Sequence, residues 1–252
     1  MSQIPKAIYI CHSTKELVET NSAHKWRKLN PSYDVHSAGD EECRTFLKMN
    51  YPPIYLQVFD YIPYPPIKSD FWRLCVLLKH GGVYVDADIE PLVPLDDFLE
   101  PTATFATCLS DYTVLNPHVL ACVPNHPIIN DCIDTYLTFY KTKKSPDYWG
   151  WSITRIMNTS MQLFRGEIIR TEGLYDDYQF ITEVCGSKPE DLYTAFCSYK
   201  GVKLLMNRAI NYDAEKHTFR ILFYISICPV QQIQLFYSKT QDLLILILHI
   251  YC

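Results

Sequence analysis

Two glycines, a short apolar run and two aspartates follow one another at Gly81–Asp88, and this stretch constrains the fold most strongly. Glycine tolerates the positive φ with which many helices end, and Val83–Val85 is a run of β-formers too short for a helix. Residues two apart in an extended chain point to the same side, so Asp86 and Asp88 are expected to face one ligand. Paired carboxylates suit Mg²⁺ or Mn²⁺, and these ions suit a diphosphate. The stretch therefore predicts a metal and diphosphate site where a buried strand ends.

The segment before the glycines predicts a helix beside this site. Ser69 is expected to cap a helix over Asp70–Lys79, whose apolar stripe has spacings of three and four residues: Phe71, Leu74, Cys75 and Leu78. Asp70 and Arg73 lie three residues apart and therefore share a different face of the helix. Either this face carries a surface ion pair, or it looks into the cleft beside the two aspartates; the sequence leaves both interpretations open.

The remaining segments alternate between strand and helix patterns, which predicts an α/β domain. Strands are expected at Ile4–Cys11, Tyr33–Ser37, Glu90–Leu95, Thr102–Leu109 and Val119–Val123, and helices at Lys15–Asn30, Asp40–Asn50, Ile128–Tyr140 and Ile153–Phe164. Asn116 is expected in a turn between strands, and Tyr51–Pro66 is expected to be irregular, with a helical turn at Ile54–Tyr61. Because the chain shows no repeat and no linker, we expect one domain over residues 1–219, followed by an apolar C-terminal tail over residues 220–252.

Charge and length limit the partners of the chain. It has 252 residues, with 28 acidic and 23 basic side chains and a net charge of -5. This balance argues against nucleic acid as a main partner, because phosphate backbones bind basic surfaces. A nucleotide ligand remains compatible with it, because a bound metal ion compensates the charge.

Ten cysteines are scattered singly, and no two form a Cys-x-x-Cys pair. This spacing argues against a zinc ribbon or a thioredoxin-type site and favours a reducing compartment. No apolar run reaches the roughly 18 residues of a spanning helix, and no signal peptide is evident, so a cytoplasmic location is favoured. The apolar runs Ile221–Val230 and Leu243–Ile250 leave buried strands, a partly disordered tail and a peripheral membrane contact open.

Three further places carry candidate binding residues, and each also has a purely structural interpretation. His126 precedes a helix and either packs on the core or belongs to a site. Trp149 and Trp151 form either a packing plug or a platform for stacking on a sugar. Asp176 and Asp177 lie either in a surface turn or in a cleft wall. These five residues are the candidate contacts for an acceptor molecule.

Taken together, Ile67–Arg73 and Gly81–Asp88 resemble the DXD-containing glycosyltransferases of family 32. That family includes initiating mannosyltransferases and inositol-phosphoceramide mannosyltransferases, and its sugar-binding region also occurs in the clostridial glucosylating toxins. The likeness runs from about residue 4 to about residue 160. It implies a GT-A fold, a Rossmann-like mixed sheet flanked by helices that binds a nucleotide sugar at its strand ends.

The resemblance also implies roles for individual residues. Asp86 and Asp88 would hold Mn²⁺ or Mg²⁺ on the diphosphate of a UDP- or GDP-hexose, as both metal-binding and catalytic residues. Asp70 and Arg73 would bind the donor sugar and its phosphate side, and they would also be catalytic residues. The further donor-binding residues would be Tyr9, Tyr84 and Asn116. The expected activity is that of a hexosyltransferase that retains the anomeric configuration and acts on a glycan, lipid or protein acceptor.

The opening strand departs from the family pattern. Tyr9–His12 stands where the family usually has His-Gln-x-Trp, so the nucleotide stays open, although Tyr9 is still suited to stacking on a base. This departure supports an alternative, a catalytically inactive GT-A-like domain that binds glycans or proteins. A third interpretation is a sugar nucleotidyltransferase or hydrolase, against which the lack of a glycine-rich phosphate loop counts.

Overall fold

The computed structural model describes residues 3–110, 114–144, 146–166, 169–185, 194–208, 234–238 and 245–249. Contacts within the chain divide it into two units, Met1–Ala209 and Ile210–Cys252. The described part of the second unit is an antiparallel hairpin of β11 (Gln234–Ser238) and β12 (Ile245–His249). The rest of the predicted tail lies outside the described residues. The first unit contains all the residues of the predicted site.

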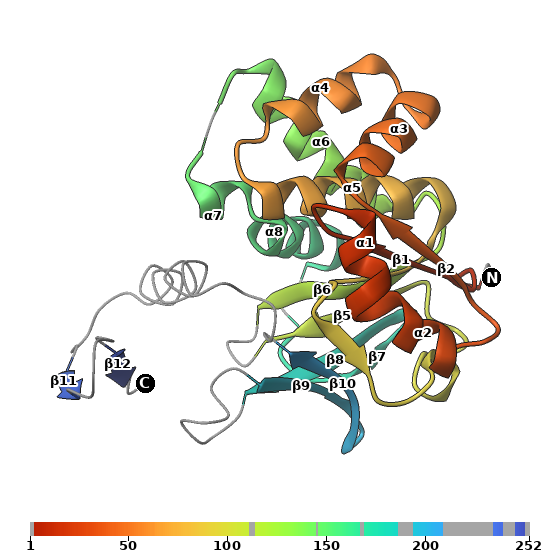
Figure 1. The fold of residues 1–252 in the computed structure, drawn as a ribbon, viewed down its shortest axis with the longest axis vertical. Helices are drawn as coiled ribbons and strands as arrows, with labels where there is room; N and C mark the ends of the chain where they lie inside the picture. The colour runs from red at the N-terminus through yellow and green to blue at the C-terminus, as the bar shows by residue number, and fades with distance from the viewer. Residues whose placement is uncertain are drawn as a thin grey trace. The chain divides into compact units, whose positions relative to one another are not determined.

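A mixed sheet of ten strands forms the centre of the first unit (Figure 1). Its order is β2-β1-β3-β6-β5-β8-β9-β10-β4, and β7 pairs with β8 off this path. The pairs β1/β2, β1/β3 and β5/β8 are parallel, and the other pairs are antiparallel. The strands are β1 (Ala7–Cys11), β2 (Asp34–Ala38), β3 (Gly82–Val85), β4 (Ile89–Pro91), β5 (Phe105–Leu109), β6 (Leu115–Cys122), β7 (Gly173–Tyr175), β8 (Tyr178–Cys185), β9 (Thr194–Tyr199) and β10 (Val202–Arg208). The α/β class predicted from the sequence is confirmed.

Helices cover both faces of this sheet (Figure 1). One face packs on α3 (Asp40–Asn50), α4 (Pro53–Tyr61), α5 (Pro65–His80), α6 (Pro127–Lys141), α7 (Tyr148–Trp151) and α8 (Ile153–Arg165). The other packs on α1 (Lys15–Val18), a π-helical turn (Glu19–Ala23), α2 (His24–Leu29) and a 3₁₀ turn (Leu95–Asp97). In β3, Tyr84 belongs to the first core, and Val83 and Val85 belong to the second, as the alternation of a strand requires. None of the helices in the described ranges is both long and apolar enough to cross a membrane.

Helix α5 begins at Pro65, earlier than the expected start at Asp70. Proline in the first helical turn removes no helix hydrogen bond, because those N–H groups have no partner inside the helix. Ser69 therefore lies inside the helix and is not its cap. Gly81 ends the helix with φ +64°, and a Cβ there would lie 2.8 Å from the carbonyl oxygen of Cys122. Both the φ angle and the neighbouring strand require the glycine predicted at this position.

The helical turn expected at Ile54–Tyr61 is confirmed as the helix α4, Pro53–Tyr61, again with a proline at its start. One expectation about a neighbouring segment is wrong. Asn116, expected in a turn, lies in β6, because this strand already begins at Leu115. The pairing of β5 with β6 shifts register beside it, and this irregularity accommodates Pro117, which has no N–H for a ladder.

Candidate functional site

The carboxyl ends of four strands meet at one edge of the sheet. β1, β3, β5 and β8 run in the same direction, and β6 runs opposite to them, so its first residues reach the same edge. Asp86 follows β3 there, and Asn116 and Glu183 lie at the adjacent ends of β6 and β8. The carboxyl ends of strands are the usual ligand sites of α/β sheets. The predicted acidic site therefore lies where such a sheet binds its ligands.

The chain turns after Asp86 instead of continuing as an extended strand. The Asp86 N–H donates to the carbonyl of His118 over 2.9 Å, and the Ile89 N–H donates to the carbonyl of Asp86 over 3.0 Å. β3 ends at Val85, and β4 begins at Ile89. The expected extended geometry of the two aspartates is therefore wrong, because a turn, and not the alternation of a strand, sets the direction of Asp88.

The guanidinium of Arg73 ties helix α5 to the ends of β3 and β6. Its Nη2 lies 2.7 Å from Asp70 Oδ1 and 3.0 Å from Asp86 Oδ1, and its Nη1 donates to the Pro117 carbonyl over 2.5 Å. Arg73 is 4% exposed and Asp70 is 7% exposed, so the interpretation as a surface ion pair is wrong. Burial lowers the pKa of Arg73, but the nearby anionic groups, Asp86 first among them, outweigh burial and raise that pKa. Arg73 is therefore a fixed positive charge behind the exit of β3.

Asp70 is the buried acid of this network. Its Oδ2 accepts a hydrogen bond of 3.2 Å from the Ile153 N–H at the start of α8. The pKa of this carboxyl is raised to about 6, mainly by burial. The charge of Arg73 lowers this pKa, and the charge of Asp86 raises it further. At neutral pH the carboxylate form still predominates, so Asp70 and Arg73 remain an ion pair.

Tyr84 supports Asp86 from within the sheet. Its hydroxyl donates to Asp86 Oδ1 over 2.9 Å, and the central carbon of the Arg73 guanidinium lies 4.2 Å from the centre of its ring. Because Tyr84 is 0% exposed, it positions Asp86 and offers no exposed surface to a ligand. The Asp86 side chain is 32% exposed, and it is the member of this network that reaches solvent.

The acids fit a divalent cation by charge and by chemistry. Asp70 and Asp86 bring two carboxylates against the guanidinium of Arg73, which leaves one negative charge when all three groups are ionised. Both contacts that Asp86 makes within the described part of the chain go to Oδ1, so Oδ2 is left for a cation. Asp88 is also partly exposed. Carboxylate oxygens are the ligands that Mg²⁺ and Mn²⁺ prefer, and water or phosphate oxygens complete their shells.

Two of the predicted donor-binding residues make contacts within the protein. The ring of Tyr9 is stacked on that of His36, with centroids 5.1 Å apart, and Tyr9 is 8% exposed. His36 therefore already covers one face of the Tyr9 ring. The Asn116 amide donates to Glu183 Oε2 over 2.9 Å. Sequence reasoning missed Glu183, because a single glutamate in a mostly apolar strand has no distinctive pattern.

Three of the acceptor candidates lie at the opposite edge of the sheet from Asp86. Asp176 and Asp177 form the turn that leads into β8, and His126 follows the last residues of β6, which lie beside the start of β5. His126 is 3% exposed, its ring centroid lies 5.0 Å from that of Phe105, and burial lowers its pKa to about 4. The structure therefore does not bring these three residues together with the acidic site.

The two tryptophans have different surroundings. Trp151 is 0% exposed, and its ring packs on those of Tyr136 and Phe139, with centroids 6.0 Å and 5.2 Å away. It is a packing plug in the first core. Trp149 is partly exposed and lies edge-on to Tyr148, with ring centroids 5.7 Å apart. Only Trp149 therefore has a surface that a sugar can reach.

Tyr148 is a second residue that sequence reasoning missed. Burial raises its pKa, and the charges of Asp70 and Asp86 add to the rise, which places its hydroxyl in their field. The Ile153 N–H, a few residues further on, donates to Asp70 over 3.2 Å. The short helix α7 and the start of α8 thus cover one side of the acidic site. One tyrosine among the nineteen of the chain gives no signal of this position.

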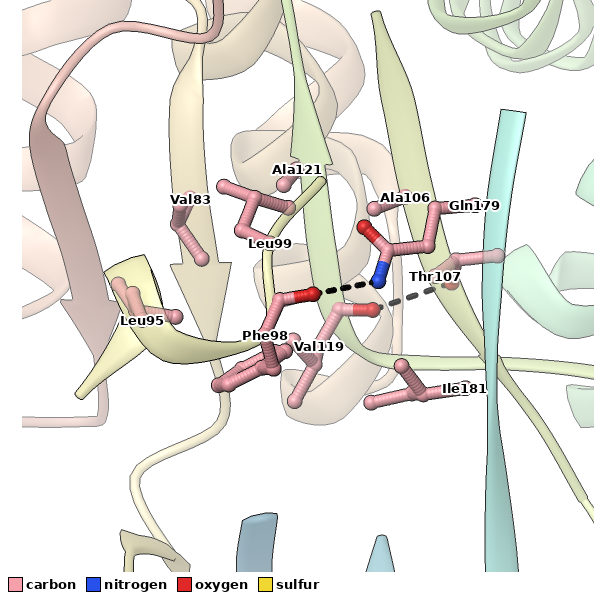
Figure 2. Close-up of a pocket in the computed structure, with 10 residues that line it drawn as sticks. All are labelled: Val83, Leu95, Phe98, Leu99, Ala106, Thr107, Val119, Ala121, Gln179 and Ile181. Atoms are coloured by element: carbon pink, nitrogen blue, oxygen red, sulfur yellow. Dashed lines mark hydrogen bonds between the residues drawn. The ribbon is translucent and has the colours of Figure 1, made fainter. Parts of the chain in front are cut away.

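A small cavity in the second core is not part of the acidic site (Figure 2). Its walls are mainly aliphatic side chains such as Val83, Leu99 and Val119. The Gln179 amide, also in its wall, donates to the Phe98 carbonyl over 2.7 Å. Neither the acids of the site nor its arginine line this cavity. A diphosphate needs charged or N–H partners, so the cavity does not suit one.

Comparison with known proteins finds that Asp86 and Asp88 lie in a region that is similar to glycosyltransferases. Residues 18–105 match the family model described as the glycosyltransferase sugar-binding region containing the DXD motif. A mannosyl phosphorylinositol ceramide synthase of Saccharomyces cerevisiae is 29% identical over 170 residues, which cover 64% of this chain and 40% of that protein. An uncharacterized glycosyltransferase of Acanthamoeba polyphaga mimivirus is 32% identical over 106 residues, which cover 41% of this chain and 42% of that protein. The matched part of the chain thus spans about two fifths of the length of these relatives.

A solved structure shows the same fold. The PaToxG glycosyltransferase superposes with a TM-score of 0.51 and 20% sequence identity, over 66% of this chain and 70% of that chain. This likeness concerns the fold alone, and together with the mixed sheet it confirms the GT-A architecture. In this chain the DXD motif is Asp86-Ala87-Asp88, at the carboxyl edge of that sheet. Residues 18–105 are therefore similar to the sugar-binding region that contains the DXD motif in glycosyltransferases.

Proposed function

We propose that this chain is a metal-dependent hexosyltransferase that takes its sugar from a nucleotide-diphosphate donor. The observation that carries the proposal is the Asp86 carboxylate, which is held 3.0 Å from Arg73 Nη2 and 2.9 Å from the Tyr84 hydroxyl while its side chain is 32% exposed. A carboxylate that is fixed on one side and open on the other is prepared to bind a cation. Asp88, two residues further on, supplies a second partly exposed carboxylate.

The residues of the site divide into ligands and positioning residues. Asp86 and Asp88 would hold Mn²⁺ or Mg²⁺, which when bound neutralises the charge of the leaving diphosphate. Arg73 keeps Asp86 in place and adds a fixed positive charge, and Asp70 keeps the guanidinium in place. Because Asp70 and Arg73 are 7% and 4% exposed, we assign them to positioning Asp86 at the floor of the site.

The charge of the site suits the bond that breaks in glycosyl transfer. As the bond from C1 of the sugar to the diphosphate oxygen lengthens, positive charge develops on the sugar ring. The fixed carboxylates at the exit of β3 stabilise that charge, because they need no rearrangement during the reaction. We also propose retention of the anomeric configuration, on the resemblance to family 32, and the anomeric proton signals of the product would test it.

The relatives favour a mannose-type donor. The yeast relative is named for the synthesis of a mannosyl phosphorylinositol ceramide. We therefore propose a GDP- or UDP-hexose as donor, with a mannose donor first, and a hydroxyl group of a glycan or lipid as acceptor. Trp149, partly exposed beside Tyr148 in α7, is the aromatic side chain that we assign to the sugar-binding surface.

A thermal-shift panel of nucleotide sugars, with and without Mn²⁺, tests this proposal. We expect the largest rise in melting temperature for one UDP- or GDP-hexose, and only when the ion is present, because a ligand that binds the folded state stabilises it. A catalytically inactive glycan-binding domain would instead be stabilised by glycans without the ion. If no nucleotide sugar stabilises the chain in the presence of Mn²⁺, the proposal is wrong.

A further inference from the structure

Two cysteines and a histidine meet at the carboxyl edge of the sheet, behind the acidic site. Cys108 comes from β5, His118 from β6 and Cys197 from β9. The Cys108 and Cys197 sulfur atoms are 3.7 Å apart, and His118 Nε2 lies 3.0 Å from Cys197 Sγ. All three possible ligand atoms lie within 4.8 Å of one another, and the residues are 0%, 5% and 2% exposed. Among the described residues this is the one group of three such side chains with that spacing.

The distances fit a tetrahedral zinc ion. Zinc–sulfur bonds of about 2.3 Å place two thiolates about 3.8 Å apart around a tetrahedral ion. The two sulfur atoms are already at 3.7 Å. The corresponding nitrogen–sulfur distance is about 3.5 Å, so the His118 ring would move back by about half an ångström.

Glu183 lies next to this group. It stands directly opposite Cys197 in the pairing of β8 with β9, so the two side chains lie on the same face of the sheet. Glu183 is 8% exposed, and the amide of Asn116 donates to its Oε2 over 2.9 Å. Asn116 in turn stands opposite Cys108 in the pairing of β5 with β6. Ligands of a metal ion are commonly held by such hydrogen bonds from a neighbouring side chain.

We propose that Cys108, His118 and Cys197 bind one zinc ion, with the Glu183 carboxylate as the fourth ligand and Asn116 as its hydrogen-bonding support. The ligands come from four different strands, so the sequence contains no Cys-x-x-Cys spacing that would indicate the site. This site is separate from the DXD aspartates, which offer oxygen ligands only. A soft thiolate site selects zinc, whereas the aspartates select Mn²⁺ or Mg²⁺.

The proposed zinc site would brace the backbone that holds the acidic site. The His118 carbonyl accepts the Asp86 N–H over 2.9 Å, and the adjacent Pro117 carbonyl accepts Arg73 Nη1 over 2.5 Å. This part of β6 lies where its pairing with β5 shifts register. An ion that fixes the His118 side chain therefore fixes the segment to which Asp86 and Arg73 are attached.

The metal content of the purified full chain tests this proposal without an activity assay. After exposure to zinc and dialysis, mass spectrometry of the metals should find about one zinc ion per chain. Cys108→Ser and Cys197→Ser should each lower that content at least tenfold, and Glu183→Gln should weaken zinc affinity about 10- to 100-fold. Cys122→Ser is the matched control, because Cys122 is a buried thiol at the other end of β6 and outside the cluster. It should keep its zinc, and so should Asp88→Asn.

Cobalt substitution keeps the test decisive if a serine variant does not fold. Co²⁺ bound to the wild-type chain should show the absorption bands of a tetrahedral cobalt–thiolate site, which aspartate ligands alone do not produce. A wild-type chain that retains no zinc and shows no thiolate bands would overturn the proposal. So would zinc that both serine variants keep, or a Cys108–Cys197 disulfide in the freshly purified protein. Each of these results is independent of whether the chain transfers sugars.

Discussion

Arg73 Nη2 lies 2.7 Å from Asp70 Oδ1 and 3.0 Å from Asp86 Oδ1, so one nitrogen atom joins a buried acid to a partly exposed one. This contact connects helix α5 to the turn after β3. Because each charge in a buried network depends on its partners, the direction of Asp86 depends on Asp70 as well as on Arg73. A change at Asp70 or Arg73 is therefore expected to alter both the stability of the fold and the position of Asp86, the proposed metal ligand.

Replacing Arg73 by Met is expected to lower the free energy of unfolding by about 3–5 kcal/mol, because Asp70 stays buried without a partner charge. Arg44→Met is the matched control, since Arg44 pairs with Asp60 at the surface, where both side chains are 40% exposed; its loss should stay below about 1 kcal/mol. Urea unfolding followed by circular dichroism measures both losses. Adding Asp70→Asn to Arg73→Met should restore part of the stability, whereas strictly additive losses would contradict the pairing.

The stability of the chain should depend on pH through Asp70. Burial raises the pKa of this carboxyl to about 6 from 3.8. Between about pH 4 and about pH 6 the folded chain therefore keeps a proton that the unfolded chain has lost, so this group makes stability fall as the pH rises through that window. Relative to Asp70→Asn, which cannot ionise, the wild type should lose up to about 3 kcal/mol between pH 4 and pH 7. Unfolding free energies of both proteins at several pH values test this, and parallel curves would rule out the raised pKa.

Tyr84→Phe is expected to weaken binding of Mn²⁺ and nucleotide about tenfold while the fold stays intact. The variant keeps the buried ring but removes the hydroxyl that donates to Asp86 over 2.9 Å, so the carboxylate loses one of its two fixed contacts. Tyr61→Phe is a suitable control, because the Tyr61 ring packs on Tyr140 and Trp151 in the first core. Titration calorimetry measures the affinities, and equal affinities in Tyr84→Phe and the wild type would show that the hydroxyl does not position Asp86.

Gly81→Ala should destabilise the fold more than Gly166→Ala. Both glycines end helices with positive φ, +64° and +71°. Gly166 lies in the left-handed helical region, where alanine costs about 1–2 kcal/mol, and Gly81, with ψ -161°, lies in a region that essentially only glycine adopts. A Cβ at Gly81 would also lie 2.8 Å from the Cys122 carbonyl oxygen, whereas nothing lies within 4 Å of one at Gly166. Thermal or urea unfolding should therefore show about 1–3 kcal/mol of extra loss for Gly81→Ala, and equal losses would contradict the close approach of β6.

The sequence predicts the local parts of the site well and the long-range parts poorly. Gly81–Asp88 predicts a helix end, a buried strand and acids at its exit, because each of these rests on neighbouring residues. The early start of α5 at Pro65 was missed, because a proline pair looks like a turn unless it occupies the first helical positions. The turn at Asp86 was missed because one of its two hydrogen bonds goes to the carbonyl of His118, on another strand.

Residues that act across strands leave little trace in the sequence. Cys108, His118 and Cys197 come together only because the sheet order places β6, β5 and β9 near one another. His126 and Asp177 resemble site residues by type, but strand direction places them at the opposite edge. Topology, which depends on contacts far apart in the chain, therefore decides which polar residues share a site.

Dependence of turnover on a divalent ion and on Asp88 tests the proposed activity most directly. The measurement is release of sugar or nucleoside diphosphate from a panel of UDP- and GDP-hexoses, with Mn²⁺ and after its removal by a chelator. We expect turnover that requires the ion and falls at least about 100-fold in Asp88→Asn without loss of structure. Asp97→Asn, at an exposed aspartate of the 3₁₀ turn, should keep full activity. Turnover by the wild type without any divalent ion, or undiminished turnover by Asp88→Asn, would contradict the metal site at the exit of β3.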